Sequence, residues 1–176
     1  IPKNSKFSTT IDDITYTYVT PEASLVINSA NTFSKAITIK EGIPLTHKFT
    51  VNTSNPVRYI LPNKNIDTSS ISVSVQESSS DTTTTEFTRA TNIKQVYSTS
   101  PVFFLEESAD EKYEILFGQG ALGKSLKNNN IVIVDYLVCN ANKTNSANVF
   151  SVDSLSIGVS YTSAVITTNV DSLGGR

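Results

Sequence analysis

Apolar and polar residues alternate with a period of two along most of the chain, and the three-to-four-residue spacing of an amphipathic helix is nearly absent. Because successive side chains of a strand point to opposite faces of a sheet, this alternation predicts strands. Turn-forming residues end the runs, as Pro21 does after the first of them. The runs that predict strands are 14–19, 33–40, 45–51, 57–61, 71–76, 102–105, 113–117, 131–138, 152–159 and 161–168.

The run 131–138, Ile-Val-Ile-Val-Asp-Tyr-Leu-Val, is the most apolar of these. Because it is long and rich in β-branched residues, it is predicted to be a central strand. The polar stretch 77–85 predicts an exposed loop, and 86–90 is ambiguous between strand and loop. Short strands that recur between turn signals predict an all-β fold, an antiparallel sandwich or barrel-like architecture with little helix.

The length of 176 residues allows one well-buried domain or two small lobes. We predict two β lobes, in which the segments 1–44 and 151–176 form an outer lobe and the segment 45–150 is inserted between them as a central lobe. The chain contains no Met, opens on Ile1-Pro2 and closes on Gly174-Gly175-Arg176. It is therefore expected to come from the middle of a longer protein.

Composition supports the β fold and restricts the partners. Hydrophobic residues make up 38% and charged residues 17% of the chain, and Ser, Thr and Asn fill the remainder in keeping with strands and turns. The net charge of -2 and the pI near 5.4 give no attraction to nucleic acid or to an anionic membrane surface. No apolar run approaches the roughly 20 residues that span a bilayer. We therefore expect no nucleic acid and no membrane as partners.

One segment matches a nucleotide-binding motif. Residues 118–125, GQGALGKS, satisfy the phosphate-loop pattern G-x-x-x-x-G-K-[ST], and the later run 131–135 mimics a strand that ends in a metal-binding Asp135. A phosphate loop needs a helix to start at its Lys and Ser, whereas 126–130 is short and ends in three Asn residues. The sequence instead predicts two antiparallel strands joined by a glycine-rich hairpin, whose glycines serve left-handed backbone conformations.

The sequence offers few other residues that could form a catalytic or metal-binding site. The one histidine, His47, is expected to be a partly exposed strand residue, and the one cysteine, Cys139, a buried and unreactive thiol. The acidic pairs Asp12-Asp13 and 106–107 with 110–111 are expected in solvated turns, with a bound ion as the alternative. The sequence therefore predicts no enzyme activity, no metal and no cofactor, although spacing alone leaves paired carboxylates of a glycosidase open.

The glycine-rich segment also resembles the signature of a known protein family. The stretch 113–124, YEILFGQGALGK, resembles the IxFGDGxxGK signature of the baseplate J-like family, with Gln119 in place of the usual Asp. The resemblance implies a structural hairpin at Phe117, Gly118, Gly120 and Gly123. Other likenesses to the large baseplate wedge protein of contractile-tailed bacteriophages are KFSTT at 6–10, KEG at 40–42, LPNKNIDTS at 61–69 and SLGG at 172–175.

The resemblance implies a structural protein of the virion, placed in the tail baseplate and assembled in the host cytoplasm. Its partners would be copies of itself, which join in the full-length protein into a ring around the tail hub, and neighbouring baseplate proteins. The alternative is an adhesin or cell-surface β-sandwich domain, which the Thr, Ser and Asn content fits equally well. The glycine-rich segment favours the baseplate, because generic surface sandwiches have no need of it.

Overall fold

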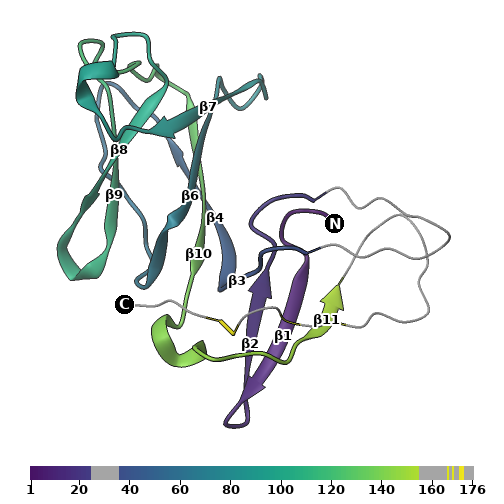
Figure 1. Ribbon diagram of the computed structural model, residues 1–176. Coiled ribbons are helices and arrows are strands. Elements are labelled where there is room, and N and C mark those ends of the chain that lie inside the picture. The colour runs from purple at the N-terminus through teal and green to yellow at the C-terminus, as the bar shows by residue number, and fades with distance from the viewer. Residues whose placement is uncertain (25–35, 155–165, 167, 169–170, 173–176) are drawn as a thin grey trace, which may run out of the picture. The chain divides into compact units, whose positions relative to one another are not determined.

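The computed structural model of the chain describes residues 1–24, 36–154, 166, 168 and 171–172. This part of the chain is mostly strand, and its helical segments are short 3-10 turns at Ile93–Gln95 (η1), Ala109–Glu111 (η2) and Ala141–Thr144 (η3). The predicted all-β fold is confirmed (Figure 1). None of the helices described here has the length and apolar character to cross a membrane.

The chain divides into two compact units, which are described separately. Unit 1 consists of Ile1–Pro44 and Leu137–Arg176, and unit 2 consists of Leu45–Tyr136. From the sequence, the second segment of the outer lobe was expected to begin at residue 151. In the structure, the second segment of unit 1 begins at Leu137. The intervening segment belongs to unit 1 because Ala147 is part of its core and the Thr144 carbonyl accepts a hydrogen bond from the Tyr18 hydroxyl (3.1 Å).

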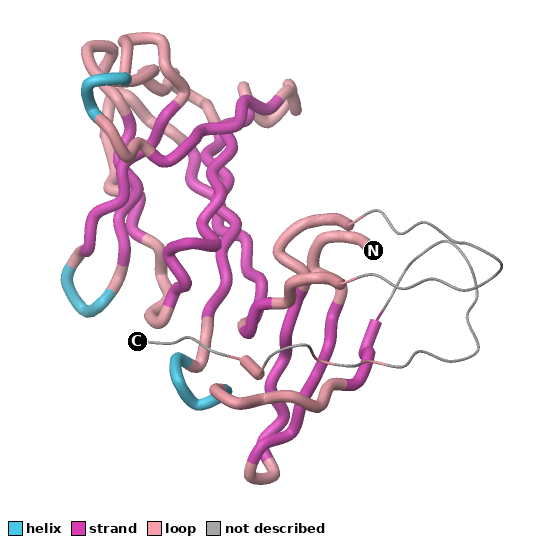
Figure 2. The backbone as a smooth tube through the Cα atoms, in the orientation of Figure 1, coloured by secondary structure: helices cyan, strands magenta, loops and turns pink. Residues whose placement is uncertain are grey.

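Unit 1 is built on a four-stranded antiparallel sheet in the order β11-β1-β2-β3 (Figure 2). Phe7 lies opposite Tyr18 and Thr9 opposite Tyr16, so these side chains share one face. The strands are Lys6–Ile11 (β1), Ile14–Val19 (β2), Lys40–Glu41 (β3) and Ser151–Ser154 (β11). The core on that face consists of Phe7, Tyr16, Tyr18 and Ala147, surrounded by Ile11, Ile37, Ile39, Phe150, Val152 and Ile166.

The turn between β1 and β2 contains the acidic pair Asp12-Asp13, as the sequence predicts. Both residues have positive φ angles, 50° and 63°, in the manner of a two-residue type I′ hairpin turn. Of the described part of the predicted strand 33–40 only Lys40 is in a strand, whereas Ile37 and Ile39 pack against the core from a segment outside the sheet. Residues 33–35 lie outside the described residues. Of the predicted strand 161–168 the structure describes only residues 166 and 168, neither of which is in a strand, and the end of 152–159 lies outside the described residues.

A clamp between Glu41 and Asn140 joins the two segments that border unit 2 in the sequence. The Asn140 backbone N–H and side-chain amide donate to the two Glu41 carboxylate oxygens, at 2.9 and 2.8 Å. Next to it, the Cys139 thiol donates to the Glu41 carbonyl at 3.1 Å. Cys139 is half-buried and not buried as predicted, because this hydrogen bond places its sulfur beside a short edge strand.

Unit 2 contains a seven-stranded sheet in the order β4-β10-β6-β7-β8-β9-β5. Strand β5 pairs antiparallel with β9, as do β6 with β7 and β8 with β9, whereas β7 and β8 run parallel. Residues 90–101 join β7 to β8, about the dozen residues that a parallel crossover needs. The apolar strand β10 lies inside the sheet, as predicted. The strands are Ile43–Thr50 (β4), Tyr59–Ile60 (β5), Ile66–Gln76 (β6), Thr84–Arg89 (β7), Val102–Glu107 (β8), Tyr113–Phe117 (β9) and Ile131–Val138 (β10).

A row of aromatic rings closes this sheet on itself. Phe49 on the edge strand β4 meets Tyr59 on the opposite edge strand β5, with ring centroids 5.4 Å apart. Tyr59 then contacts Phe117 on β9, which contacts Phe87 on β7, each at 5.5 Å and edge to face. Because the contacts of Phe49 with Tyr59 and of Phe117 with Phe87 join strands that are not neighbours in the sheet, the sheet is curled and nearly barrel-shaped around them. Burial in this interior raises the pKa of Tyr59 above its ordinary value.

The aromatic row predicts that Phe117 stabilises unit 2. Replacing it with Ala (Phe117→Ala) removes two ring contacts of a half-buried side chain, so we expect the free energy of unfolding to fall by about 1–3 kcal/mol. Urea denaturation followed by circular dichroism measures the loss. The control is Tyr97→Ala, whose side chain is 72% exposed and whose effect should stay within about 0.5 kcal/mol. Equal effects of the two variants would contradict the closed interior.

Candidate functional site

The glycine-rich segment does not form the predicted hairpin. Strand β9, which precedes it, pairs with β8 and β5, whereas β10, which follows it, lies between β4 and β6. The prediction of paired strands is wrong because β9 already forms a tight hairpin with β8 and has its other side occupied by β5. Residues 118–130 therefore form a connection that passes β8, β7 and β6 in the sheet order before β10 begins.

The connection is fixed by backbone hydrogen bonds to the β7–β8 crossover. The Gly123 N–H donates to the Tyr97 carbonyl at 3.0 Å, and the Lys124 N–H donates to the Ser100 carbonyl at 2.7 Å. Inside the connection the Gly120 N–H donates to the Gly123 carbonyl at 3.2 Å. The glycine-rich segment and the crossover are thus held together as one structure, although the bonded residues are 24 and 26 positions apart in the sequence.

The glycines serve two different needs. Gly118 is buried where the chain folds back on itself, and a Cβ there would overlap the carbonyl oxygens of Leu122 and Gly123. Gly120 and Gly123 have φ angles of +82° and +89°, which side chains rarely adopt. A Cβ at Gly120 would meet open space, so only backbone conformation requires glycine at that position. Phe117, the fourth predicted position, anchors the segment through the aromatic row.

The glycine-rich segment matches a phosphate loop in sequence but not in structure. The residues after Lys124-Ser125 form no helix before β10 begins at Ile131. The N–H groups of Gly120, Gly123 and Lys124 are directed at carbonyl oxygens of the protein itself. Asp135 lies several residues along β10 and accepts a hydrogen bond from Thr46 on β4. The arrangement is that of a structural connection and not of an anion cradle.

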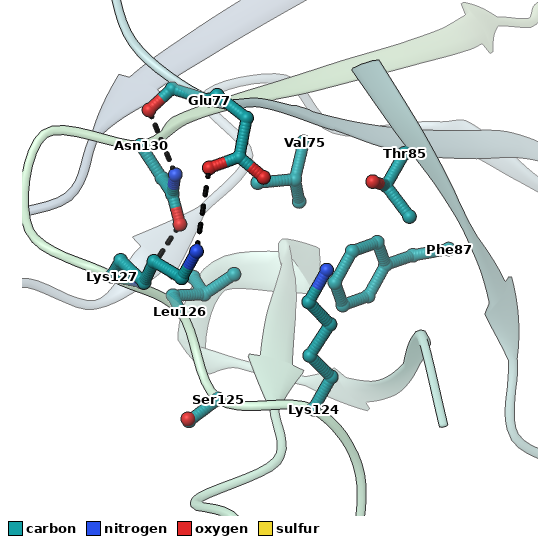
Figure 3. Close-up of a pocket in the computed structure, with 9 residues that line it drawn as sticks. All are labelled: Val75, Glu77, Thr85, Phe87, Lys124, Ser125, Leu126, Lys127 and Asn130. Carbon is teal, nitrogen blue, oxygen red and sulfur yellow. Dashed lines mark hydrogen bonds and ion pairs between the residues drawn. The ribbon is translucent and has the colours of Figure 1, made fainter. Parts of the chain in front are cut away.

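A small pocket borders the end of the same connection (Figure 3). Val75, Thr85 and Phe87 form one side of it, and residues 124–127 form the other. Asn130 holds the two sides together, because its amide donates to the Glu77 carbonyl at 2.9 Å and its oxygen accepts from the Lys127 N–H at 2.7 Å. The Lys127 ammonium also lies 3.7 Å from the Glu77 carboxylate. These polar groups are therefore engaged with one another.

The remaining residues that could bind a metal or take part in catalysis do not cluster in the described structure. His47 is half-exposed on β4, as predicted, and its ring contacts Phe49 at 4.6 Å. Within the described ranges, no three or more His, Cys, Asp and Glu side chains come together as a metal site would require. The acidic turn between β8 and β9 is the second predicted acidic cluster, and η2 forms its centre.

An ion pair that the sequence did not reveal borders this acidic turn. The Arg58 guanidinium binds the buried Glu114 carboxylate through Nε, at 3.0 and 3.1 Å to its two oxygens, and through Nη2. The pKa of the Arg58 guanidinium is raised by this hydrogen bond and charge. The partners are far apart in the sequence, so only the pairing of β5 with β9 reveals them.

The end of unit 2 that carries the glycine-rich segment also gathers its exposed apolar side chains. Tyr97 is 72%, Ile93 60%, and Leu122 and Val57 both 47% exposed, and no other large hydrophobic residue described in unit 2 is exposed to this degree. Ile93 and Tyr97 lie on the crossover, Leu122 on the glycine-rich segment, and Val57 two residues before Tyr59, which pairs with β9. We call Val57, Ile93, Tyr97 and Leu122, with the exposed Lys94 next to Ile93 in the chain, the loop-end patch.

Comparison with known proteins gives one result. The sequence profile of the third domain of bacteriophage baseplate wedge protein gp6 matches residues 46–150. No curated protein matches the chain significantly. The matched segment contains nearly all of unit 2 and the whole glycine-rich connection, and it covers more than half of the chain.

The backbone at Gly120 predicts a specific cost of substitution. Gly120→Val forces a β-branched residue to a φ of +82°, so we expect a loss of about 1–3 kcal/mol of stability although the side chain meets no neighbour. Gly120→Asn should cost less, because Asn enters the positive-φ region more readily. Thermal denaturation of both variants measures the difference. If Gly120→Val were as stable as the unmodified chain, the left-handed conformation would be refuted.

Proposed function

Because the chain belongs to the family of bacteriophage baseplate wedge protein gp6, we propose that it contributes protein–protein contacts to the ring-forming baseplate of a contractile tail. The family is structural, and its place in the virion is the wedge of the tail baseplate. We propose that its partners are copies of the full-length protein in the ring and neighbouring baseplate proteins. We also propose that it assembles in the host cytoplasm and catalyses no reaction.

The observation that carries the proposal is the profile match over residues 46–150. The geometry of the matched segment supports it, because the backbone of the glycine-rich connection is hydrogen-bonded within the protein while Leu122 on it is exposed. Exposed apolar residues gathered on neighbouring loops are typical of interaction surfaces. A closed barrel-like sheet also leaves few strand edges exposed, which suits a component that has to pack beside many copies of itself.

Two finer points belong to the same proposal. We propose that the two compact units are two domains, with the central one inserted into the outer one, because the chain leaves and re-enters unit 1 beside the Glu41–Asn140 clamp. We also propose that the segment 113–124 is the J-like signature. Its glycine spacing supports this, and Gln119 in place of the usual Asp lies in the exposed part of the connection.

The proposed location predicts where an antibody against this chain binds. We expect gold-labelled antibody raised against residues 1–176 to decorate the distal end of the tail in electron micrographs of phage particles from the same source. Antibody pre-adsorbed with the purified chain is the control and should leave the tails unlabelled. Label on fibres or on a cell surface, with a bare tail tip, would overturn the baseplate location and favour an adhesin.

A further inference from the structure

Residues 52–60 cross the surface of unit 2 between two buried residues, and we call them the strap. Val51, just before the strap, is 4% exposed, and Leu61, just after it, is completely buried. Between these two residues, 52–58 are all exposed. Segments with few buried contacts open more readily than the buried residues around them. The strap is therefore fixed at its two ends and has little burial to hold its middle.

The strap is attached to the sheet through one short strand. β5 (Tyr59–Ile60) has two residues, whereas the other strands of unit 2 have five or more. It stands at the end of the sheet order, so it pairs on one side, with β9. Toward β4, the opposite edge strand, the described contact is between the rings of Phe49 and Tyr59. An edge strand of this length is a candidate for local opening.

An ion pair joins the strap to β9. The Arg58 guanidinium binds the Glu114 carboxylate through Nη2 and through Nε, which lies 3.0 and 3.1 Å from the two oxygens. The partners differ in exposure, because the Arg58 side chain is 66% exposed and that of Glu114 is 9% exposed. On its other side, Glu114 lies directly opposite Glu106 of β8. Like charges opposite each other on paired strands repel, and the closed strap supplies a cation that offsets this repulsion.

We propose that the strap opens and closes as a unit between its two buried ends, and that the ion pair of Arg58 with Glu114 is the latch that holds it closed. Opening takes the Tyr59 ring away from Phe117 and leaves this edge of β9 without its partner strand. Val57 of the loop-end patch lies on the strap, so the patch is complete only while the strap is closed. The inference does not depend on the proposed function.

The unequal exposure of the two partners predicts unequal effects of removing them. Without Arg58, the closed strap would keep the Glu114 carboxylate buried and opposite Glu106, and opening would relieve that cost. Without the Glu114 charge, Arg58 loses a partner but stays hydrated, because most of its side chain is exposed. Loss of the arginine should therefore open the strap more than loss of the carboxylate does. Loss of both should resemble loss of the carboxylate alone.

Hydrogen exchange of single backbone amides, followed by NMR spectroscopy on the whole chain, measures the opening. The Leu61 N–H donates to the Tyr113 carbonyl of β9, and the Tyr59 N–H, two residues earlier, is directed to the same side because amides alternate along a strand. The Val51 N–H reports on the fixed end. We expect the Tyr59 amide to exchange at least about tenfold faster than the Val51 amide and to respond less steeply to urea. Equal rates with equal urea slopes would show that the strap opens only with the whole unit, and would overturn the proposal.

Three variants test the latch. Arg58→Met keeps the apolar part of the side chain and removes the charge, so exchange of the Tyr59 amide should rise by at least about tenfold. Glu114→Gln should raise it less, and the double variant should exchange like Glu114→Gln. A double variant that exchanges as fast as Arg58→Met would overturn the latch, because lost packing and not a buried charge would then open the strap. If Arg58→Met does not fold, recovery of the fold in the double variant supports the latch, and failure to recover it refutes the latch.

Lys64→Met is the matched control. Lys64 lies 3.6 Å from Glu111 beside the same turn, but both side chains are exposed, at 50% and 77%. Because exposed ion pairs contribute little, this variant should change exchange of the Tyr59 amide by less than about twofold. An effect as large as that of Arg58→Met would show that any loss of positive charge at this edge opens the strap, and would refute the specific latch. None of these outcomes alters the antibody label at the tail tip, which tests the proposed function separately.

Discussion

The structure of unit 2 depends on a sheet that has to bury its apolar face against itself. Among the described residues, neither a helix of length nor a second sheet belongs to this unit, so the curled sheet supplies its own cover. The two edge strands meet where Phe49 contacts Tyr59, and Tyr59 in turn contacts Phe117. Because Phe117 is followed at once by Gly118, the same contact fixes the point from which the glycine-rich connection starts. The position of the connection is therefore a consequence of how the barrel closes.

The sequence predicts the strands well because strand formation depends on a local pattern. The runs 14–19, 113–117 and 131–138 are strands with those bounds. Which strands pair is not a local property, since alternation determines the faces of a strand and not its neighbours. For this reason β9 and β10, which are consecutive in the sequence, were predicted to pair and do not. The parallel pairing of β7 with β8 escaped prediction for the same reason, and so did the ion pair of Arg58 with Glu114.

The glycine-rich segment shows how far a motif can be read without its surroundings. The sequence predicted left-handed glycines, and Gly120 and Gly123 have positive φ angles. It gave no sign that Gly118 is needed for close approach to Leu122 and Gly123, nor that the segment is bonded to the crossover. Both depend on residues that the fold brings together from afar. The same residues match a phosphate-loop pattern, but no helix follows Ser125 in the described structure, and the N–H groups of Gly123 and Lys124 donate to carbonyl oxygens of the crossover.

A rigid connection has a physical advantage for a protein that works through contacts. A mobile loop loses conformational entropy when it is ordered at an interface, and that loss reduces affinity. Here the hydrogen bonds from Gly123 and Lys124 to the crossover order the loop before any partner arrives. Tyr97 and Leu122 are then presented with little further entropic cost. The glycine-rich connection therefore does not form a phosphate-binding site. Its consequence is an apolar surface that is ordered before a partner binds.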